Sequence, residues 1–286
     1  MDPLVSVIMP SYNHRQYVVD AIQSVLAQTY RNIELVVVDD GSQDGSSDLL
    51  KELSREHGFS LHLGRNGGLC RTLNKGVQHS HGKYIAPIAS DDVWVHDKLE
   101  RQVRLLESND AIAACSGGHL KISPTGEPLP FYKQRFYRAA ELSFEDVFLW
   151  RGTLSGPLAM VRRSVFDQTA GYDESCTVED WDLWLRIANL GYKLYRMPHI
   201  LGFYRIHSAN TYSNIAVTEP SLLRSASKFS QHPNYQQAIK AIYLRSFGIL
   251  SSTDRRKALP YLGKAFHPNL AYLKALVKLA IPYDSK

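Results

Sequence analysis

The sequence predicts an α/β fold: a doubly wound, mainly parallel sheet with a helical appendage at the C-terminus. Short apolar runs alternate with stretches of helical periodicity through residues 1–110, which is the β-α-β pattern of such folds. These runs are nearly continuous in apolar residues, as strands covered on both faces tend to be. After residue 213 only helical patterns remain, and these predict the appendage. Of the 286 residues, 44% are hydrophobic and 21% are charged, which is ordinary for a globular protein with a sizeable core.

The first half alternates four strands with four helices. The strands are expected at residues 5–9, 33–38, 60–63 and 83–90. The helices are expected at residues 17–26, at 46–56, in a segment that carries Arg71 and Asn74, and from Asp97 onward, where Glu100 follows an acidic N-cap.

The middle of the chain is less regular. Strands are expected at 111–116 and 158–161, a short helix at 142–150, a helical turn at 163–168, and a basic, aromatic excursion at 131–138. A helix at 179–190 with Gly191 as its C-cap should precede a pair of strands at 193–197 and 201–205.

The C-terminal segment is basic. Residues 221–286 hold eleven Lys and Arg against two Asp, a net charge of +9, which leaves −4 for residues 1–220 of the total of +5. Helices are expected at 221–229, 235–250, 255–266 and 270–281. The last has an apolar stripe beside two lysines, so it could lie on anionic lipid, or the helices could form a lid packed on the body. A polynucleotide partner is disfavoured because no nucleic-acid-binding module is recognisable.

Cysteine usage and the N-terminus indicate a cytoplasmic protein. Cys70, Cys115 and Cys176 are widely spaced and form no disulfide framework or zinc motif. The first residues lack the pattern of a signal peptide, and no apolar run reaches the roughly 18 residues of a membrane span. We therefore expect a cytoplasmic location, with peripheral contact to the inner face of the membrane if the tail binds lipid.

Three loops at strand ends form the candidate site, since ligands bind at the carboxyl edge of open α/β sheets. They are residues 10–13, 39–45 and 91–94. Asp91 and Asp92 would repel each other on an exposed rim, and a divalent cation would relieve that repulsion. The alternative is that both are turn residues only.

The Asp-rich second loop fits no common rival motif. Lys51 stands where an EF-hand starting at Asp40 needs Glu, and neither G-x-G-x-x-G after the first strand nor a P-loop motif is present. An Asx turn with a helix cap explains Ser42 and Asp44 but not both Asp39 and Asp40, and a carboxylate here can accept an N–H from a base. Glu179 and Asp180 can likewise be read as capping a helix or as catalytic.

Together these motifs resemble the inverting nucleotide-sugar glycosyltransferases of family 2, which have the GT-A fold. The matching stretches, which span residues 4–210, are Val5-Ser6-Val7-Ile8-Met9-Pro10-Ser11-Tyr12-Asn13, Val38-Asp39-Asp40-Gly41-Ser42-x-Asp44-Gly45, Asn66-x-Gly68 with Arg71 and Asn74, Ser90-Asp91-Asp92, Glu179-Asp180 and Tyr204-Arg205-x-His207.

The resemblance implies a nucleotide site. Pro10 and Tyr12 would flank the nucleobase, with Asn13 in the same loop, and Asp40 would accept the N3–H of uracil or thymine. Asp39 is a weaker candidate for the nucleoside. Arg71 would lie near the diphosphate, and Asp91 would contact the ribose or the metal.

It also implies a metal and a base. Asp92, together with Asp91 and His207, would hold Mn²⁺ or Mg²⁺, although Ala89 stands where many relatives have a further Asp. Asp180 would be the catalytic base that deprotonates the acceptor hydroxyl, with Glu179 and Asp182 as alternatives.

The expected function is therefore transfer of one sugar, with inversion, from a nucleoside diphosphate sugar, above all a UDP-sugar, to a glycan or lipid-linked acceptor in bacterial surface polysaccharide synthesis. Residues 1–213 would be the catalytic domain, with a nucleotide-sugar half at about 1–115 and an acceptor half at about 116–213; residues 214–286 would be the extension. The alternatives are a nucleotide-sugar-binding scaffold without turnover and a sugar-1-phosphate nucleotidyltransferase. The oligomeric state stays open.

Overall fold

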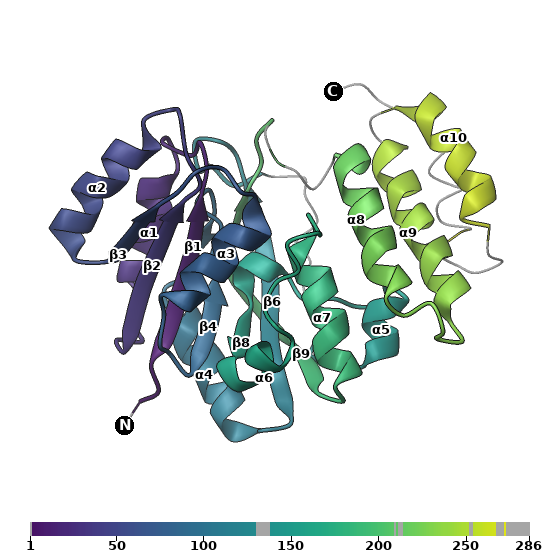
Figure 1. Cartoon of the computed structure of the whole chain (residues 1–286), viewed down its shortest axis with the longest axis horizontal. Coiled ribbons are helices and arrows are strands. Elements are labelled where there is room, and N and C mark those ends of the chain that lie inside the picture. Colours follow the sequence, from purple (N-terminus) through teal and green to yellow (C-terminus); the bar gives the residue numbers. More distant parts are fainter. Residues whose placement is uncertain are drawn as a thin grey trace.

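A mixed sheet with helices on both faces forms the centre of the molecule in the computed structural model (Figure 1). The structure describes residues 2–129, 138–208, 210, 214–251, 254–266 and 272. Within these residues one nine-stranded sheet has the order β3-β2-β1-β4-β8-β6-β9-β5, and β7 pairs with β9. The strands are β1 Val5–Ser11, β2 Ile33–Asp39, β3 Ser60–Leu63, β4 Tyr84–Pro87, β5 Val93–Trp94, β6 Ile112–Ile122, β7 Ala140–Leu142, β8 Met160–Arg162 and β9 Lys193–Arg205.

The helices follow the predicted alternation. They are α1 Val18–Leu26, α2 Ser46–His57, α3 Leu69–Gln78, α4 Lys98–Ser108, α5 Phe144–Phe148, α6 Arg163–Gln168, α7 Glu179–Asn189, α8 Ile215–Ser227, α9 Tyr235–Leu250 and α10 Arg255–Lys264, with a 3₁₀ turn, η1, at Gly156–Leu158. Strands β1 to β4 pair in parallel, as do β6 and β9, and only short strands such as β8 run antiparallel. The predicted doubly wound, mainly parallel sheet is confirmed.

Two cores, one on each face of the sheet, explain why the strands are nearly continuous in apolar residues. Val5, Val7 and Met9 of β1 pack in one core with residues of α1 and α4. Ile8 of the same strand packs in the other core with residues of α3. Because alternate residues of a strand point to opposite faces, a strand covered on both sides has no position left for polar residues.

The topology brings several distant segments to one edge of the sheet. β1 ends at Ser11 and β2 ends at Asp39, directly beside each other in register. β9 ends at Arg205 and runs parallel to β6. Only three residues separate α7 from β9, so the N-terminal end of α7 points back toward this same edge, at the top of Figure 1. Loops near residues 11, 39, 91, 180 and 205 therefore share the carboxyl edge of the strands.

The predicted strand pair at 193–197 and 201–205 is wrong, because the structure has one 13-residue strand, β9, through Pro198. Strand β6 is also longer than expected and pairs with β9 in parallel with shifts in register near Gly118. These irregularities accommodate a residue without an N–H. A Cβ on Gly117 would lie 2.5 Å from the carbonyl oxygen of His199, so the close approach requires glycine there. The helix expected at 142–150 is shorter, at Phe144–Phe148, and is preceded by β7.

The C-terminal helices α8 and α9 are packed into the main body. Leu222, Ala226, Ala238 and Ile242 belong to the same core cluster as residues of α7. Helix α8 begins at Ile215, earlier than predicted, with Pro220 inside it. The packing of α8 and α9 agrees with a lid for these two helices, whereas the lipid-binding alternative concerned residues 270–281 and stays a prediction. The segments 131–137 and 270–281 lie outside the described residues, apart from Tyr272. None of the helices in the described part of the chain combines the length and the apolarity that a membrane crossing requires.

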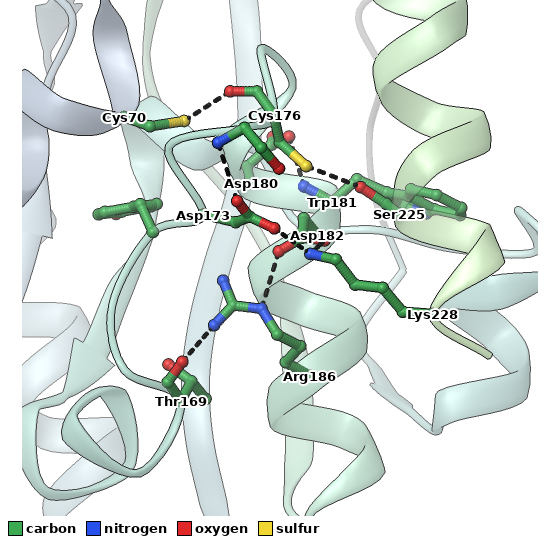
Figure 2. Close-up of polar contacts among 12 residues, drawn as sticks. Cys70, Thr169, Asp173, Cys176, Asp180, Trp181, Asp182, Arg186, Ser225 and Lys228 are labelled. Carbon is green, nitrogen blue, oxygen red and sulfur yellow. Dashed lines mark hydrogen bonds and ion pairs between the residues drawn. The ribbon is translucent and has the colours of Figure 1, made fainter.

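An ion cluster fastens α8 to α7 (Figure 2). The Lys228 ammonium at the end of α8 contacts Asp173 and Asp182, each at 2.5 Å, and Asp182 also accepts from Arg186 at 2.7 Å. Asp182 is completely buried. Because the Lys228 ammonium group contacts the carboxylates of both Asp173 and Asp182, we interpret this cluster as a network of ion pairs.

We expect Lys228→Met to destabilise the protein by about 2 kcal/mol, because it removes one of the two cations that compensate a buried carboxylate. Urea-induced unfolding measures this loss. The matched variant Lys240→Met removes the same charge from α9 outside the cluster and should cost at most about 0.5 kcal/mol. Equal losses for the two variants would show that the cluster does not hold the tail.

Candidate active site

Two loops at the carboxyl edge are tied together by side chains. Asn13 adopts a left-handed conformation (φ 54°), which Asn tolerates better than most residues. Its side-chain oxygen accepts from the backbone of Gln43 at 2.8 Å, and its own N–H donates to the hydroxyl of Ser42 at 2.9 Å. The backbone N–H of Arg15 donates to Asp44 at 2.9 Å. Asn13 therefore fixes the shape of the candidate nucleotide site.

Asp39 and Asp40 are adjacent but have different partners. Asp39 accepts from the backbone and hydroxyl of Ser42 and from the hydroxyl of Ser47, so it forms the turn and anchors the start of α2. Asp40 accepts from the N–H groups of Gly67 and Gly68 at 2.8 and 3.0 Å. These two bonds hold the Asp40 carboxylate in place. Each of its oxygens can accept a further hydrogen bond, so Asp40 remains an acceptor for a ligand.

Three other predicted nucleotide residues lie on segments at the same edge of the sheet. Tyr12 is 44% exposed at the end of β1, next to the partly buried Pro10. Arg71 is exposed in the first turn of α3, and a Cβ on Gly67 would lie 2.8 Å from its Cδ. Pro10, Tyr12, Asp40 and Arg71 thus belong to neighbouring segments of one edge.

A cluster of two imidazoles and one carboxylate lies beside them. The ligand atoms of His14, Asp91 and His207 all lie within 4.8 Å of one another. His207 Nε2 is 2.8 Å from Asp91 Oδ2, and His14 Nδ1 is 3.9 Å from Asp91 Oδ1. The ring of His207 stacks on Tyr17 with centroids 5.0 Å apart. Burial lowers the pKa of His14, which favours its neutral form. Sequence reasoning missed His14, although it directly follows the Tyr12-Asn13 motif.

Asp92 faces inward rather than toward this cluster. It is 2% exposed, and its Oδ1 accepts from the backbone N–H of Arg205 at 3.0 Å. Burial, and then the charge of Asp91, raise its pKa. Arg205, itself buried, donates to the carbonyl of Asp91 and pairs with Asp20. Asp92 and Arg205 therefore join the end of β9 to the loop that presents Asp91.

A second acidic pair stands at the N-terminus of α7. Asp180 accepts from the N–H of Trp181 at 2.6 Å and from the N–H of Gly156 at 3.1 Å. Burial raises the pKa of Glu179 to about 8, with the Asp180 charge adding to the shift. Burial also raises the pKa of Asp180, while its two N–H bonds and the charge of Arg245 on α9 oppose the rise. Asp182, the third candidate for the catalytic base, accepts hydrogen bonds from the charged groups of Arg186 and Lys228.

Contacts from α3 support the segment before α7 (Figure 2 shows the cysteines). The thiol of Cys70 donates to the carbonyl of Cys176 at 2.9 Å. The side chain of Asn74 bonds both the N–H and the carbonyl of Tyr172. Burial raises the pKa of Cys70 and of Tyr172, and the nearby charge of Glu179 adds to both shifts. Asn74 therefore links α3, the helix that follows Gly68, to the segment that leads into α7.

Trp94 connects the two acidic centres. It lies in β5, directly after the Asp91 loop, and its indole N–H donates to the carbonyl of Pro157 at 2.9 Å. Pro157 follows Gly156, whose N–H holds Asp180. Gln102 of α4 supports the same turn through the carbonyl of Leu158 at 2.9 Å. Sequence reasoning missed both contacts, since hydrogen bonds over such separations leave no local pattern.

Solved structures show which known fold this chain shares. TarS from S. aureus, in a fragment in complex with UDP-GlcNAc, aligns with a TM-score of 0.67 and 17% identity, covering 96% of this chain and 88% of that one. The mannosyltransferase PcManGT from Pyrobaculum calidifontis, in complex with GDP-Man and Mn²⁺, aligns with a TM-score of 0.66 and 18% identity, covering 98% and 80%. The fold is that of the GT-A glycosyltransferases.

Sequence comparison then gives the family. The model of glycosyl transferase family 2 matches residues 6–169, more than half of the chain. TuaG of Bacillus subtilis (strain 168), a glycosyltransferase named for teichuronic acid biosynthesis, is 33% identical over 216 residues, covering 74% of this chain and 82% of TuaG. WfaP of Escherichia coli, named as a UDP-Glc:alpha-D-GlcNAc-diphosphoundecaprenol beta-1,3-glucosyltransferase, is 25% identical over 213 residues, covering 74% and 80%. This chain belongs to glycosyl transferase family 2 and is a glycosyltransferase.

The predicted family and enzyme class are confirmed, and membership removes the nucleotidyltransferase alternative. The matched region ends at residue 169. Glu179, Asp180 and His207 lie beyond it, so their roles rest on the geometry described above and stay predictions.

Proposed function

We propose that this enzyme transfers one sugar from a UDP-sugar to a glycan or lipid-linked acceptor, with inversion at the anomeric carbon and with help from a divalent cation. One observation carries the proposal. The sheet presents two separate acidic centres at one edge, Asp91 with two imidazoles and the Glu179–Asp180 pair, and the contact of Trp94 with Pro157 joins them. Inverting transfer needs one centre for the departing diphosphate and another for the attacking hydroxyl.

Asp40 is suited to reading the nucleobase. Its carboxylate is held by two glycine N–H groups, so its orientation is fixed before a nucleotide binds. A rigid acceptor favours a base that offers a ring N–H, such as the N3–H of uracil, over one that offers a ring acceptor. The exposed ring of Tyr12, directly after the neighbouring strand β1, would cover the base. Thymine and guanine also offer a ring N–H, so this acceptor disfavours adenine and cytosine and is compatible with the UDP-sugar that we propose as donor.

The donor atoms beside this site fit a divalent cation. A carboxylate and imidazole nitrogens are ordinary ligands, and two ligands of one ion lie roughly 3–4 Å apart, close to the separations in the cluster. Asp91 and His207 would hold the ion, while the inward-facing Asp92 would support their loop. When bound, such an ion neutralises the charge that develops on the leaving diphosphate. The Mn²⁺ in the PcManGT structure is consistent with this assignment.

Asp180 is the group best suited to act as base. Two closely placed, half-buried carboxyls share one negative charge more easily than they carry two. Asp180 accepts two backbone N–H bonds and feels the positive charge of Arg245, whereas Glu179 is raised to a pKa of about 8. The charge therefore resides on Asp180 and the proton on Glu179. Asp180 takes the proton of the acceptor hydroxyl as its oxygen attacks the anomeric carbon and the bond to the diphosphate breaks.

The pH dependence of kcat/KM should report the ionisation of Asp180. A carboxyl group acts as base only when ionised, so kcat/KM falls as pH falls through its raised pKa. Arg245→Met removes a charge that lowers the pKa of Asp180, so the acid limb of the profile should move to higher pH. Profiles taken at saturating Mn²⁺ measure the shift. Lys240→Met is the control that removes a charge from the same helix, and an equal shift in both variants would contradict a specific effect on Asp180.

Gly156 should be required for the position of the base. A Cβ at this residue would lie 2.9 Å from Asp180 Cβ and 3.2 Å from its Oδ2. We expect Gly156→Ala to displace the carboxylate and to lower kcat by about 10- to 100-fold, with the KM for the donor nearly unchanged. Steady-state kinetics separates the two parameters. Gly248→Ala in α9, where a Cβ meets nothing within 4 Å, should leave both unchanged.

The proposal is tested by incubating the protein with UDP-, GDP- and dTDP-sugars, with and without Mn²⁺, and with polyprenyl diphosphate-linked saccharides as acceptors. Release of UDP that depends on both acceptor and metal supports it. A lipid-linked acceptor is included because the name of WfaP states one. Binding of a nucleotide sugar without turnover on any acceptor would favour the scaffold alternative.

A further inference from the structure

The cluster of His14, Asp91 and His207 contains a histidine that the family resemblance did not suggest. His14 lies in the loop between β1 and α1, far in sequence from Asp91 and His207, yet its ligand atom falls within the same 4.8 Å group. Its ring meets the ring of His207 edge-on with centroids 5.6 Å apart. His14 Nδ1, which lies 3.9 Å from Asp91 Oδ1, also has the hydroxyl of Ser90 at 2.8 Å, a contact that this nitrogen would exchange for a bound cation.

The loop at residues 89–92 offers few carboxylates to a cation. Ala89 and Ser90 precede Asp91, and Asp92 is turned inward to the backbone of Arg205. Asp91 is therefore the one carboxylate that the described residues contribute to the cluster, and the other two donors are imidazoles. The supports of the cluster are also built into the fold: Tyr17 stacks on His207, and the amide oxygen of Asn210 accepts from the His207 backbone at 2.7 Å.

We propose that His14 is a third protein ligand of the divalent cation, and that the resulting set of two imidazoles and one carboxylate selects Mn²⁺ or Co²⁺ over Mg²⁺. This inference rests on the proposed function, since it concerns the metal of the same site. Mg²⁺ prefers oxygen ligands and retains its waters, whereas imidazole nitrogen favours transition metals. Replacing a carboxylate by an imidazole therefore weakens Mg²⁺ more than it weakens Mn²⁺ or Co²⁺.

The test measures metal binding directly on the whole chain of 286 residues. Calorimetric titrations with Mn²⁺, Co²⁺ and Mg²⁺, each with and without UDP, give the affinities. Pulsed electron paramagnetic resonance of bound Mn²⁺ counts coordinated imidazole nitrogens. The variants are His14→Gln, which retains a polar side chain near Ser90, His14→Asp, which restores a carboxylate, and His57→Gln, an exposed histidine of α2 as control.

In the wild type we expect two imidazole nitrogens on Mn²⁺ and tighter binding of Mn²⁺ than of Mg²⁺. His14→Gln should show one nitrogen and bind Mn²⁺ about 10- to 100-fold more weakly, while thermal unfolding stays cooperative. His14→Asp should recover affinity with its preference moved toward Mg²⁺, and His57→Gln should match the wild type.

A single nitrogen in the wild type, or full Mn²⁺ affinity in His14→Gln, would overturn the role of His14 and leave the proposed function standing. A wild type that binds neither UDP nor any of the three metals would overturn both.

Discussion

Asp180→Asn is expected to lower kcat by about 10²- to 10⁴-fold, the range typical of losing a general base, while the KM for the nucleotide sugar changes little. The two N–H donors bond different oxygens of Asp180, so the amide can keep one of these bonds through its single oxygen, and it cannot take a proton. Because Asp180 accepts these bonds at the N-terminus of α7, the fold should tolerate the change. Steady-state rates with saturating donor and acceptor give kcat.

Two neighbouring variants make this result specific. Glu179→Gln mimics the protonated form that we assign to Glu179 and should lower kcat far less. Asp182→Asn weakens the ion pairs with Arg186 and Lys228, so it should lower the stability more than the rate. A larger loss of kcat in Glu179→Gln than in Asp180→Asn would move the role of base to Glu179.

Asp91→Asn should abolish the metal-dependent part of activity. Asp91 is the carboxylate of the cluster, and a neutral amide attracts a divalent cation much less strongly. We expect kcat to fall about 100-fold or more at ordinary Mn²⁺ concentrations, since the ion contributes several kcal/mol to stabilising the transition state. Activity as a function of Mn²⁺ concentration measures the effect.

Asp48→Asn is the matched control, because Asp48 is an exposed carboxylate whose partner is Lys51 of the same helix. Its activity and metal dependence should equal those of the wild type. If Asp91→Asn kept its full response to Mn²⁺, the cluster of His14, Asp91 and His207 would not be the metal site.

The strands of the sheet could be predicted from the sequence, because burial on both faces gives each strand a local run of apolar residues. The apolar runs in β1 and β2 are covered on both faces, and periodicity reports this directly. β9 was missed as a single strand because Pro198 signals a break, while the shifted pairing with β6 that tolerates the proline depends on a partner about eighty residues away. The pairing of β9 with β6 therefore outweighed the local rule that a proline ends a strand.

In the candidate site, too, local patterns could be predicted from the sequence, whereas contacts between distant segments could not. The adjacent pairs Asp39–Asp40 and Asp91–Asp92 are visible in the sequence, but which member faces outward depends on distant partners. Gly67 and Gly68 hold Asp40, whereas Arg205 takes Asp92 inward. His14 and Gly156 were missed because their importance comes from side chains that approach them from other segments.

The most direct test of the account is calorimetric titration of the protein with UDP, GDP, dTDP and NAD, each with and without Mn²⁺. We predict that UDP binds, that Mn²⁺ tightens it at least about tenfold, and that Asp91→Asn removes this gain while retaining metal-independent binding. Absence of binding to every nucleoside diphosphate, or UDP binding that ignores both Mn²⁺ and Asp91, would contradict the proposed metal-assisted transfer from a UDP-sugar.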